Sequence, residues 1–541
     1  MRPITFAALP LAFALIGAAQ PATTLPQSSA AERVRAHVTF LSSDLLEGRD
    51  TGSRGHEIAA SYVVSQLQAL GLKPGGDKGS WYQQVPYRRA TLDGVPTLSF
   101  TSRGGSVPLT HGADVTVRPN LVTRNMKVNA GLVFVGYGIA DPVLGIDDYR
   151  GVDAKGKIVV AFSGTPKGLR SDVSAHLGQV KPQTAAARGA VGYVEIPANP
   201  LGNWGPLVTS AARPVTNWAD GKGGSGQGRA APLLRMSFSK ATAERLFAGA
   251  RQTLAAAQSE AAAGRQPKGF ALTGQLRVDA TSKWEDFTSP NVVAVLPGTD
   301  PKLSNEYVAL MGHLDHIGVR KGAKPGEDAI NNGALDNASG VSTMLETARS
   351  FVASGQAPKR SLLFLAVTGE EVGLTGADYF ATNPTVPLPR IAALVNLDMP
   401  LLLYPFRDVI AFGAEHSNIV KAVDAAGRAM QVSTTADPMP EQGLFTRSDH
   451  YRFVTRGVPS VFLMTGYANG GEAQWKKFLG GCYHHPCDEV GQGIDWEAAA
   501  RFGELNYRIA RQLADAPERP RWYADSYFGR TFGGSQPKLA R

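Results

Sequence analysis

Five short apolar segments in the second half of the 541-residue chain restrict its fold more than any other feature. None of them contains a charged residue, and a helical pattern at 338–353 lies between the second and the third. Alternation of strand, loop and helix is typical of an α/β sheet. We therefore expect an α/β domain that begins near residue 285. The five expected strands are NVVAVL (291–296), YVALMG (307–312), SLLFLAV (361–367), AALVNL (392–397) and SVFLM (460–464).

The preceding part of the chain has a different character. Residues 30–72 are predicted to form a helix, a turn and a second helix, and Gly71 ends the second helix. Between 110 and 280, short β-type segments such as GKIVVAFSG (156–164) are separated by turns rich in glycine and proline. A chain of this length is expected to form two or three domains. We therefore predict a separate, strand-rich module before the α/β domain.

The N-terminus, MRPITFAALPLAFALIGAAQ, combines Arg2 with an apolar stretch and small residues at 17–19. This pattern predicts a signal peptide over residues 1–22, cleaved near Ala19 or Ala22. A membrane span needs about 20 apolar residues, and Pro10 interrupts this stretch. We expect a periplasmic or secreted chain with no stable membrane insertion after signal cleavage.

The net charge of +9 raises the question of a nucleic-acid partner. The lysines and arginines are scattered, however, and no run of five or six occurs. Because scattered basic residues are typical of a solvated surface, we expect no nucleic-acid binding.

Polar residues directly follow three of the apolar segments. They are His313, Asp315, Glu370, Glu371 and Asp398. Open α/β sheets place their functional sites beyond the carboxyl ends of the strands. We therefore expect these side chains to meet in one crevice, together with Asp336 from the loop before the helical pattern.

The residue types in this crevice indicate a metal site. One histidine from CYHHPCDE (482–489) joins His313 and three carboxylates, those of Asp336, Glu371 and Asp398. Imidazole and carboxylate ligands suit zinc or a similar divalent ion. Five ligands are too many for one open tetrahedral site, but they fit two Zn²⁺ ions if one carboxylate bridges them.

Two residues next to the expected ligands have expected catalytic roles. Asp315 lies two positions after His313 on an extended chain, so its carboxylate is expected to orient the imidazole. Glu370 precedes a ligand but is free itself, so it is expected to act as the general base.

Five motifs carry a family resemblance. In order along the chain they are GHLDHIG (312–318), ALDNASG (334–340), TGEEVGLTGADYF (368–380), NLDM (396–399) and YHHPCDE (483–489). At these residues the sequence resembles the M28 metallopeptidases, a family of di-zinc aminopeptidases. The resemblance covers about 285–515, and FLSSDLLEGRDTGSRG (40–55) is similar to the N-terminal part of that family. It implies a mixed, mostly parallel sheet flanked by helices, of the zinc-exopeptidase type.

The resemblance also implies a role for each residue of the site. Asp336 would bridge the two metals and Glu370 would be the base. The family motif is similar to Y-H-x-P-x-D, so His484 is the implied ligand and His485 takes the variable position. The implied ligands are His313, Asp336, Glu371, Asp398 and His484.

The only two cysteines, Cys482 and Cys487, flank this histidine pair. We expect them to form a disulfide that holds the loop carrying the ligand. Two free thiols, or a cysteine metal site, are the alternatives.

The strand-rich module resembles a protease-associated (PA) domain at 134–160 and 185–196. Such inserts cover part of the active-site crevice or bind substrate. The expected organisation is an N-terminal part of the peptidase domain (27–110), a PA-like insert (111–280), an M28-like catalytic domain (285–516) and a loosely ordered C-terminal tail (517–541).

One segment departs from the family pattern. Some members supply a tyrosine hydroxyl that stabilises the oxyanion, but GLFTRSDHYRF (443–453) has no obvious matching tyrosine. We assign no residue to that role, and we expect Asp449 and His450 to shape the substrate pocket.

The resemblance predicts a zinc aminopeptidase that hydrolyses peptides with a free N-terminus. Glu370 would take a proton from a water that bridges the metals, and the resulting hydroxide would attack the scissile carbonyl. Glu370 would then return the proton to the leaving amine.

Three alternatives differ in what they require. A carboxypeptidase or dipeptidase of the glutamate carboxypeptidase type needs an arginine cluster, for which Arg447 and Arg452 are candidates. An acyltransferase resembling glutaminyl cyclase uses a single zinc, so the five-ligand set argues against it. A non-catalytic protein resembling the transferrin receptor would have lost ligands or the base, and neither is lost here.

Overall fold

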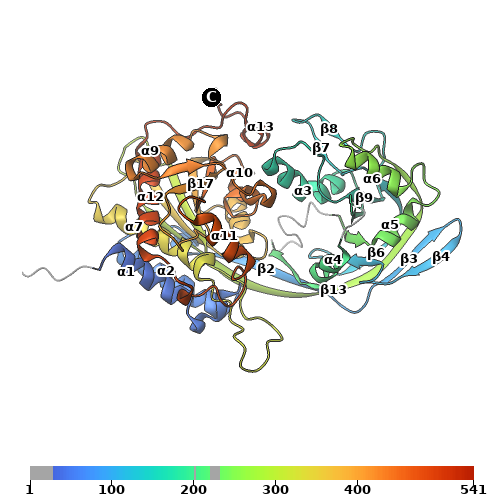
Figure 1. Ribbon diagram of the computed structural model, residues 1–541, viewed down its shortest axis with the longest axis horizontal. Coiled ribbons are helices and arrows are strands. Elements are labelled where there is room, and N and C mark those ends of the chain that lie inside the picture. The colour runs from blue at the N-terminus through green and yellow to red at the C-terminus, as the bar shows by residue number, and fades with distance from the viewer. Residues whose placement is uncertain (1–27, 200–202, 220–231) are drawn as a thin grey trace, which may run out of the picture.

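The computed structural model describes residues 28–199, 203–219 and 232–541. Two lobes stand side by side, and the strand β13 (Phe270–Leu296) runs from one into the other (Figure 1). The expected signal peptide, residues 1–22, lies outside the described residues. Among the helices of the described part, none has the length and apolar content needed to cross a bilayer.

The first lobe is built on a mixed, mostly parallel sheet, as predicted. Its strand order is β11, β2, β13, β15, β14, β16, β19, β17 and β18. The central strands β15, β14, β16 and β19 run parallel to one another. On one side β13 pairs antiparallel with β15, and β2 pairs antiparallel with β13. On the other side β17 pairs antiparallel with β19. The bounds are β1 (Lys73–Pro74), which pairs with β13, β2 (Tyr82–Leu92), β11 (Val215–Trp218), β14 (Tyr307–His313), β15 (Ser361–Val367), β16 (Ile391–Leu397), β17 (Asp408–Phe412), β18 (Ser433–Thr435) and β19 (Ser460–Thr465).

The structure confirms the five apolar segments as strands. β15 has the predicted bounds, β14, β16 and β19 differ from the prediction by one residue, and 291–296 forms the last part of β13. The predicted helix at 338–353 is α7 (Ser339–Ala353). These elements are predictable because the strands are buried along most or all of their length, so their residues must be apolar or neutral.

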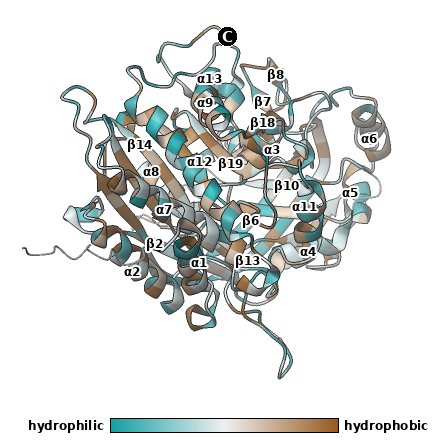
Figure 2. Cartoon of the chain, turned by 60° about the vertical axis from the view of Figure 1, so that its left-hand side comes forward, coloured by the Kyte–Doolittle hydropathy of each residue, from teal (hydrophilic) through white to brown (hydrophobic). Residues whose placement is uncertain are grey.

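Helices cover both faces of this sheet. Leu310 and Phe364 face the layer that contains α7 and α12, whereas Met311 and Leu365 face the layer that contains α8 and α10. Figure 2 shows the apolar strands of the sheet beneath helices of mixed polarity. The bounds are α1 (Ala30–Leu41), α2 (Arg54–Ala69), α8 (Thr375–Thr382), α9 (Val420–Met430), α10 (His450–Val454), α11 (Gly471–Gly480) and α12 (Trp496–Asp515).

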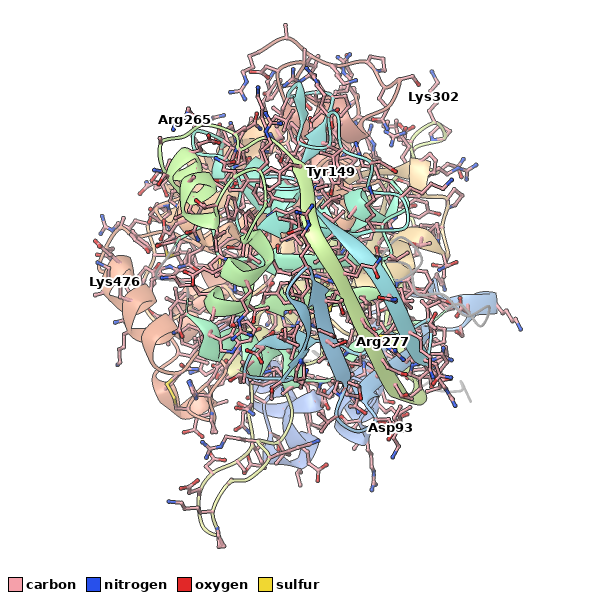
Figure 3. All side chains as sticks on the ribbon, turned by 90° about the vertical axis from the view of Figure 1, so that its right-hand side faces the viewer. Asp93, Tyr149, Arg265, Arg277, Lys302 and Lys476 are labelled. Atoms are coloured by element: carbon pink, nitrogen blue, oxygen red, sulfur yellow. A yellow bond between two sulfur atoms is a disulfide. The ribbon has the colours of Figure 1, made fainter. Side chains whose placement is uncertain are left out.

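The second lobe contains a second sheet. Its strand order is β4, β3, β13, β6, β9, β10, β12 and β5. Figure 3 shows this lobe from its outer side, with Arg277 on the long strand β13. The bounds are β3 (Thr97–Ser102), β4 (Gly105–Leu109), β5 (Val115–Val117), β6 (Asn125–Phe134), β7 (Ala140–Asp141), β8 (Ile146–Asp147), β9 (Ile158–Phe162), β10 (Gly192–Ile196), β12 (Leu234–Phe238), α3 (Ser171–Ala186), α4 (Trp204–Ala212), α5 (Lys240–Phe247) and α6 (Leu254–Ala262).

The change from one sheet to the other does not follow the expected residue boundaries. Strands β3 and β4 pair within the second sheet although they precede residue 111, and β13 crosses the expected boundary at 280–285 without interruption. The strand β11, from within the expected insert, returns to pair with β2 of the first sheet. A continuous strand leaves no linker from which sequence composition could locate the boundary.

The C-terminal segment is not a loosely ordered tail. Trp522 and Phe528 are buried, and residues 527–532 form the helix α13 (Tyr527–Phe532). The hydroxyl of Tyr527 donates to Asp141 Oδ2 of the second lobe at 2.6 Å. The prediction was wrong because the aromatic side chains that pack between the two lobes are separated along the sequence by polar and glycine residues, so no apolar run marks them.

Candidate metal centre

His313 is the last residue of β14, at the carboxyl edge of the sheet. Its Nδ1 donates to the backbone carbonyl of Asp315 at 3.1 Å, which leaves the Nε2 lone pair available for a ligand. Nε2 lies 3.1 Å from Asp398 Oδ1 and 3.2 Å from Asp336 Oδ1. The end of β14 and the end of β16 therefore bring an imidazole and carboxylates to one buried point.

Asp336 faces two histidines with its two oxygens. While Oδ1 lies 3.2 Å from His313 Nε2, Oδ2 lies 3.2 Å from His484 Nε2. The carboxylate of Asp488 supports this arrangement because it accepts hydrogen bonds from the backbone N–H groups of Leu335 and Asp336, at 2.9 and 3.0 Å. This is the placement that a carboxylate bridging two metal ions requires.

The second half of the cluster contains Glu371 and His484, whose Oε2 and Nε2 atoms lie 3.4 Å apart. His484 takes a left-handed backbone conformation, with φ 59°, inside the loop that the Cys482–Cys487 disulfide closes. The neighbouring His485 is exposed. The structure therefore brings His484 to the cluster and leaves His485 outside it.

The donor set fits divalent cations such as zinc. Within the described residues, no lysine or arginine nitrogen lies within 4.0 Å of the carboxylates of Asp336, Glu371 or Asp398, and their ion-pair partners are histidines. Burial, together with the charge of Asp336, raises the pKa of Glu371 to about 8. Burial acts to lower the pKa of His313, but Asp398 and Asp336 hold it well above its usual range. Buried carboxylates without a permanent cation are a natural site for bound metal.

Glu370 lies beside this cluster without being part of it. It lines a cavity of about 50 Å³ together with His313, Asp336 and Asp398, and its carboxylate has no hydrogen bond with the described residues. Desolvation raises the pKa of Glu370 well above its usual range, with Asp398 adding to the effect and His313 opposing it. A free carboxylate at this position can accept a proton from a nucleophile in the cavity.

The cavity opens into a larger cleft between the two lobes, with a volume of about 710 Å³. Glu370, Glu371 and His484 line it from the first lobe. Residues from α3, together with Glu195 and Arg235, line it from the second lobe. The cluster is thus reached through a cleft that both lobes form.

Asp315 acts differently from the prediction. The backbone carbonyl of Asp315, rather than its carboxylate, accepts the hydrogen bond from His313. Its buried carboxylate accepts hydrogen bonds from the backbone N–H groups of Glu370 and Glu371, at 3.2 and 3.4 Å, and from the Thr51 hydroxyl at 3.0 Å. Asp315 therefore fixes the turn that carries the two glutamates, because the chain bends after His313 and directs the carboxylate away from the imidazole.

Three residues contact the cluster but were not predicted to. His316 Nδ1 lies 2.7 Å from Glu371 Oε1, and burial lowers the pKa of His316 to about 4. Ser448 donates to Asp398 Oδ2 at 2.5 Å. The third residue is Asp488, whose carboxylate accepts hydrogen bonds from the backbone N–H groups of Leu335 and Asp336. Each lies in a segment that the sequence analysis quoted, so proximity to a motif was the available signal.

Asp449 and His450 do not line the cavity. Both are fully buried, and His450 lies between the rings of Phe445 and Phe462, at centroid distances of 5.2 and 5.4 Å. The cavity wall is formed instead by the preceding residues, among them Arg447 and Ser448. The chain turns into α10 at His450, which places the His450 ring among aromatic side chains, whereas the buried carboxylate of Asp449 interacts electrostatically with Glu370, His313 and Asp398 without lining the cavity.

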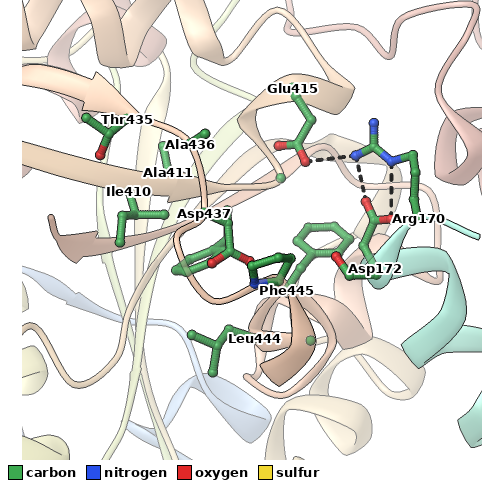
Figure 4. Close-up of a pocket in the computed structure, with 15 residues that line it drawn as sticks. Arg170, Asp172, Ile410, Ala411, Glu415, Thr435, Ala436, Asp437, Leu444 and Phe445 are labelled. Carbon is green, nitrogen blue, oxygen red and sulfur yellow. Dashed lines mark hydrogen bonds and ion pairs between the residues drawn. The ribbon is translucent and has the colours of Figure 1, made fainter. Parts of the chain in front are cut away.

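A second group of histidine and carboxylates lies between the lobes, at a pocket of about 400 Å³ (Figure 4). Arg170, beside α3, binds Asp172 Oδ2 at 2.8 Å and Glu415 Oε1 at 3.1 Å. His416 Nε2 lies 2.9 Å from Asp172 Oδ2. We call these four residues the interlobe cluster. They join the second lobe to the 3₁₀ turn Ala414–His416 of the first.

The fold and the cluster together define a class of protein, an α/β domain whose strand ends converge on a histidine–carboxylate metal site. Residues 291–510 match the sequence model of Peptidase family M28. The matched region contains all five implied ligands and Glu370.

Two curated relatives are similar to part of this chain. The leupeptin-inactivating enzyme 1 of Streptomyces exfoliatus is 28% identical over 255 residues, which are 44% of this chain and 53% of the relative. A probable leucine aminopeptidase 2 of Aspergillus oryzae is 31% identical over 272 residues, which are 46% of this chain and 51% of the relative. The chain thus spans about half the length of these curated relatives.

Among solved structures, an aminopeptidase from Aneurinibacillus sp. strain AM-1 is similar to this chain with a TM-score of 0.49 and 20% identity. The alignment covers 90% of this chain and 95% of the other. A zinc aminopeptidase from Bacillus subtilis aligns with a TM-score of 0.43 and 18% identity, over 90% of this chain and 96% of the other.

Proposed function

We propose that the chain is a zinc-dependent aminopeptidase that removes N-terminal residues from peptides. The observation that carries this proposal is the position of Asp336, whose two oxygens each lie 3.2 Å from a different histidine, with Glu370 in the same cavity. One ion would be held by His313 and Asp398, the other by His484 and Glu371, and Asp336 would be shared. When bound, two zinc ions would supply Lewis-acid polarisation of the scissile carbonyl and activation of water.

Glu370 has the position of the general base. Its carboxylate would take a proton from the attacking water as the new C–O bond forms, and would return it to the leaving amine as the C–N bond then breaks. The turn that carries it is held by two backbone N–H bonds to Asp315. The ordering of this turn keeps Glu370 directed at the cavity while Glu371 contacts the histidines.

The cavity walls indicate which N-terminal residue would fit. The apolar side chains of Met399, Leu444, Phe462 and Met464 line it beside His313. Removal of an apolar side chain from water into such walls is favourable, whereas burial of a charged side chain there is costly. We propose a preference for apolar N-terminal residues, with the remainder of the peptide in the cleft between the lobes.

The carboxypeptidase alternative has weaker support. Of its two candidate arginines, Arg452 is half-buried in the wall of the cleft and donates to the carbonyl of Gly373 at 3.1 Å. Arg447 is exposed and lines both the cavity and the cleft. Of the arginines in the described residues, Arg447 alone lines the cavity beside the metal centre, and one arginine does not form the cluster that recognition of a terminal carboxylate requires.

Two further assignments remain proposals. The second sheet, with α3 in the cleft wall, is consistent with a PA-type insert that covers part of the crevice. Location outside the cytoplasm is supported by the Cys482–Cys487 disulfide, because such bonds persist in oxidising compartments.

The proposal is tested with matched dipeptides, one with a free N-terminus and one acetylated. Each is assayed before chelation, after chelation and after zinc is restored. We expect cleavage of the free dipeptide only, lost with the chelator and recovered with zinc. Cleavage of the acetylated dipeptide would contradict the role of the amino terminus and would favour the carboxypeptidase alternative.

A further inference from the structure

The 40–55 segment, which resembles the family's N-terminal part, packs against the loops of the metal centre. Its central residue, Arg49, is 1% exposed. The Arg49 guanidinium donates from Nε to the carbonyl of Leu314 at 2.9 Å, from Nη1 to the carbonyl of Asn332 at 2.7 Å, and from Nη2 to the carbonyl of Gly333 at 3.1 Å. Nη1 also contacts the carbonyl of Leu41.

These carbonyls belong to the two loops that carry the metal centre. Leu314 lies directly after His313, and Asn332 and Gly333 precede Asp336 by four and three positions. One planar guanidinium therefore bonds both loops at once. The main chain adds to the contact, since His316 N donates to the Arg49 carbonyl at 3.3 Å and Gly318 N donates to the Gly48 carbonyl at 3.1 Å.

The backbone of this segment is shaped for close approach. Glu47, Gly48 and Arg49 have φ values of 48°, 67° and 51°, all in the left-handed region. A Cβ on Gly48 would lie 2.5 Å from the Asn331 carbonyl oxygen and 2.8 Å from that of Gly318. The segment is therefore pressed against the base of both loops, and this packing directs the arginine inward.

The chemistry of the contact is unusual for a buried charge. In the described part of the chain Arg49 has no ion-pair partner, and its four hydrogen-bond acceptors are neutral carbonyls. Burial of a charge without a paired charge is costly. A lysine presents three donors from one point, whereas the arginine fork reaches acceptors on separate segments. Hydrogen bonds to carbonyls on both loops therefore require the planar, forked guanidinium group and not only a positive charge.

We propose that Arg49 is a positioning residue of the metal centre, which fixes the loop after His313 at a set distance from the loop before Asp336. This inference rests on the proposed metal centre. If the fork is lost, the two loops can separate, and the atoms that hold the ions lose their mutual placement. The effect would fall on metal affinity and, through it, on turnover.

The test compares Arg49→Lys and Arg49→Met with the matched control Arg360→Lys. Arg360 is also fully buried and donates to the carbonyls of Leu513 and Ala516, at 3.1 and 2.5 Å, but it pairs with Glu306 and lies outside the metal centre. Zinc affinity and stoichiometry of each full-length protein are measured by competition with a chromophoric chelator. Thermal unfolding with and without zinc reports on the fold.

We expect both Arg49 variants to bind zinc about 10- to 100-fold more weakly than the wild type, the range found when groups that orient metal ligands are removed. Arg360→Lys should lower the unfolding temperature but keep the wild-type zinc affinity. Wild-type zinc affinity in a folded Arg49→Lys protein would overturn the inference. If Arg49→Met does not fold, Arg49→Gln replaces it, because its amide can bond one loop but not both.

The outcomes separate this inference from the proposed function. A wild-type chain that binds zinc but cleaves no peptide would refute the aminopeptidase proposal and leave the role of Arg49 intact. A wild-type chain that cleaves peptides, with unchanged zinc affinity in Arg49→Lys, would refute the role of Arg49 alone. A wild-type chain that binds no zinc would refute both.

Discussion

The metal centre and the interlobe cluster both contain histidine and carboxylate side chains, but they differ in whether a permanently charged cation accompanies the carboxylates. Each joins histidine to carboxylates from distant segments, and in the interlobe cluster one of these, Glu415, is exposed. In the interlobe cluster, Arg170 contacts both Asp172 and Glu415. In the metal centre, within the described residues, the carboxylates have only histidines as ion-pair partners. A group of acids and histidines is therefore not enough to indicate a metal site; the absence of a built-in cation is the distinguishing feature.

The difference also separates two tasks. The interlobe cluster is complete without a ligand, so its contribution is to hold the second lobe against the first. The metal centre is incomplete without cations and faces a cavity that contains Glu370. Chemistry is expected at one cluster and stability at the other, and the following variants test this separation.

The largest expected effect is on catalysis. Glu370→Gln removes the proposed base without removing a proposed ligand, so kcat/KM on a free dipeptide should fall by about 10²- to 10⁴-fold, the usual contribution of general acid–base catalysis. Zinc stoichiometry, measured in parallel, should not change. Asp172→Asn in the interlobe cluster should leave kcat/KM within a few-fold of the wild type. Equal losses in the two variants would erase the proposed difference between the clusters.

Metal removal should affect stability strongly. Without cations, the buried carboxylates of the metal centre repel one another, so the zinc-loaded chain should be more stable than the chelated chain. At free zinc about 1,000-fold above Kd, the gain is about 4 kcal/mol. Denaturant unfolding with zinc and with chelator measures it. The same gain in the double variant Asp336→Asn, Glu371→Gln would show that zinc stabilises the chain elsewhere.

A pH effect of intermediate size is expected at the contact between the lobes. His176 of α3 is bonded to the Tyr451 hydroxyl and surrounded by the rings of Tyr527, Phe528 and Phe532. Burial lowers the pKa of His176 to about 4, against a small opposing effect of Asp141. Below about pH 6.5, the unfolded chain binds a proton that the folded chain does not, so stability falls as the pH falls towards 4.

From pH 7.5 to pH 5, this residue should remove about 2 kcal/mol of the unfolding free energy. The measurement is denaturant unfolding of the wild type and of His176→Gln at both pH values. The difference between the two proteins isolates His176 from the titration of the metal ligands. An equal pH dependence in the two proteins would show that His176 does not titrate between its folded and unfolded values.

The smallest expected effect comes from breaking the interlobe cluster. Asp172→Asn removes charge-assisted bonds with Arg170 and His416, and should cost about 1–2 kcal/mol at neutral pH, reduced by the partial exposure of Arg170. Burial acts to raise the pKa of Asp172, but His416 and Arg170 lower it well below its usual range. The contribution is therefore present above about pH 4 and disappears as the pH falls below it. Unfolding of both proteins at pH 7 and pH 3 checks the sign.

Prediction from sequence succeeded where one local pattern decides the outcome. β15 and α7 are set by runs of apolar residues at strand or helix spacing, and His313 and Asp398 follow strands that must end at the same edge. It was less successful where one strand belongs to two sheets, and where buried residues are isolated along the chain. β13 belongs to both sheets, and the C-terminal aromatic residues have no apolar run around them.

The site shows the same division at the scale of single side chains. The residue types of the centre are visible in the sequence, but the acceptor of the His313 hydrogen bond is a backbone carbonyl, which no residue type encodes. The burial of Asp449 and His450 depends on where α10 begins, and a shift of one or two positions decides which residue lines a cavity.

The sequence by itself determined the alternation of strands and helices, the segments that carry the ligands and the chemistry of the donor set. These follow from hydrophobic periodicity and residue type, which act over a few neighbouring residues. Only the tertiary structure decided that Arg49 reaches two loops more than 260 residues away, and that Arg170 neutralises one acid group while the other has no such cation among the described residues. Those outcomes depend on contacts between segments that are distant along the chain, and such contacts are fixed only when the whole core has packed.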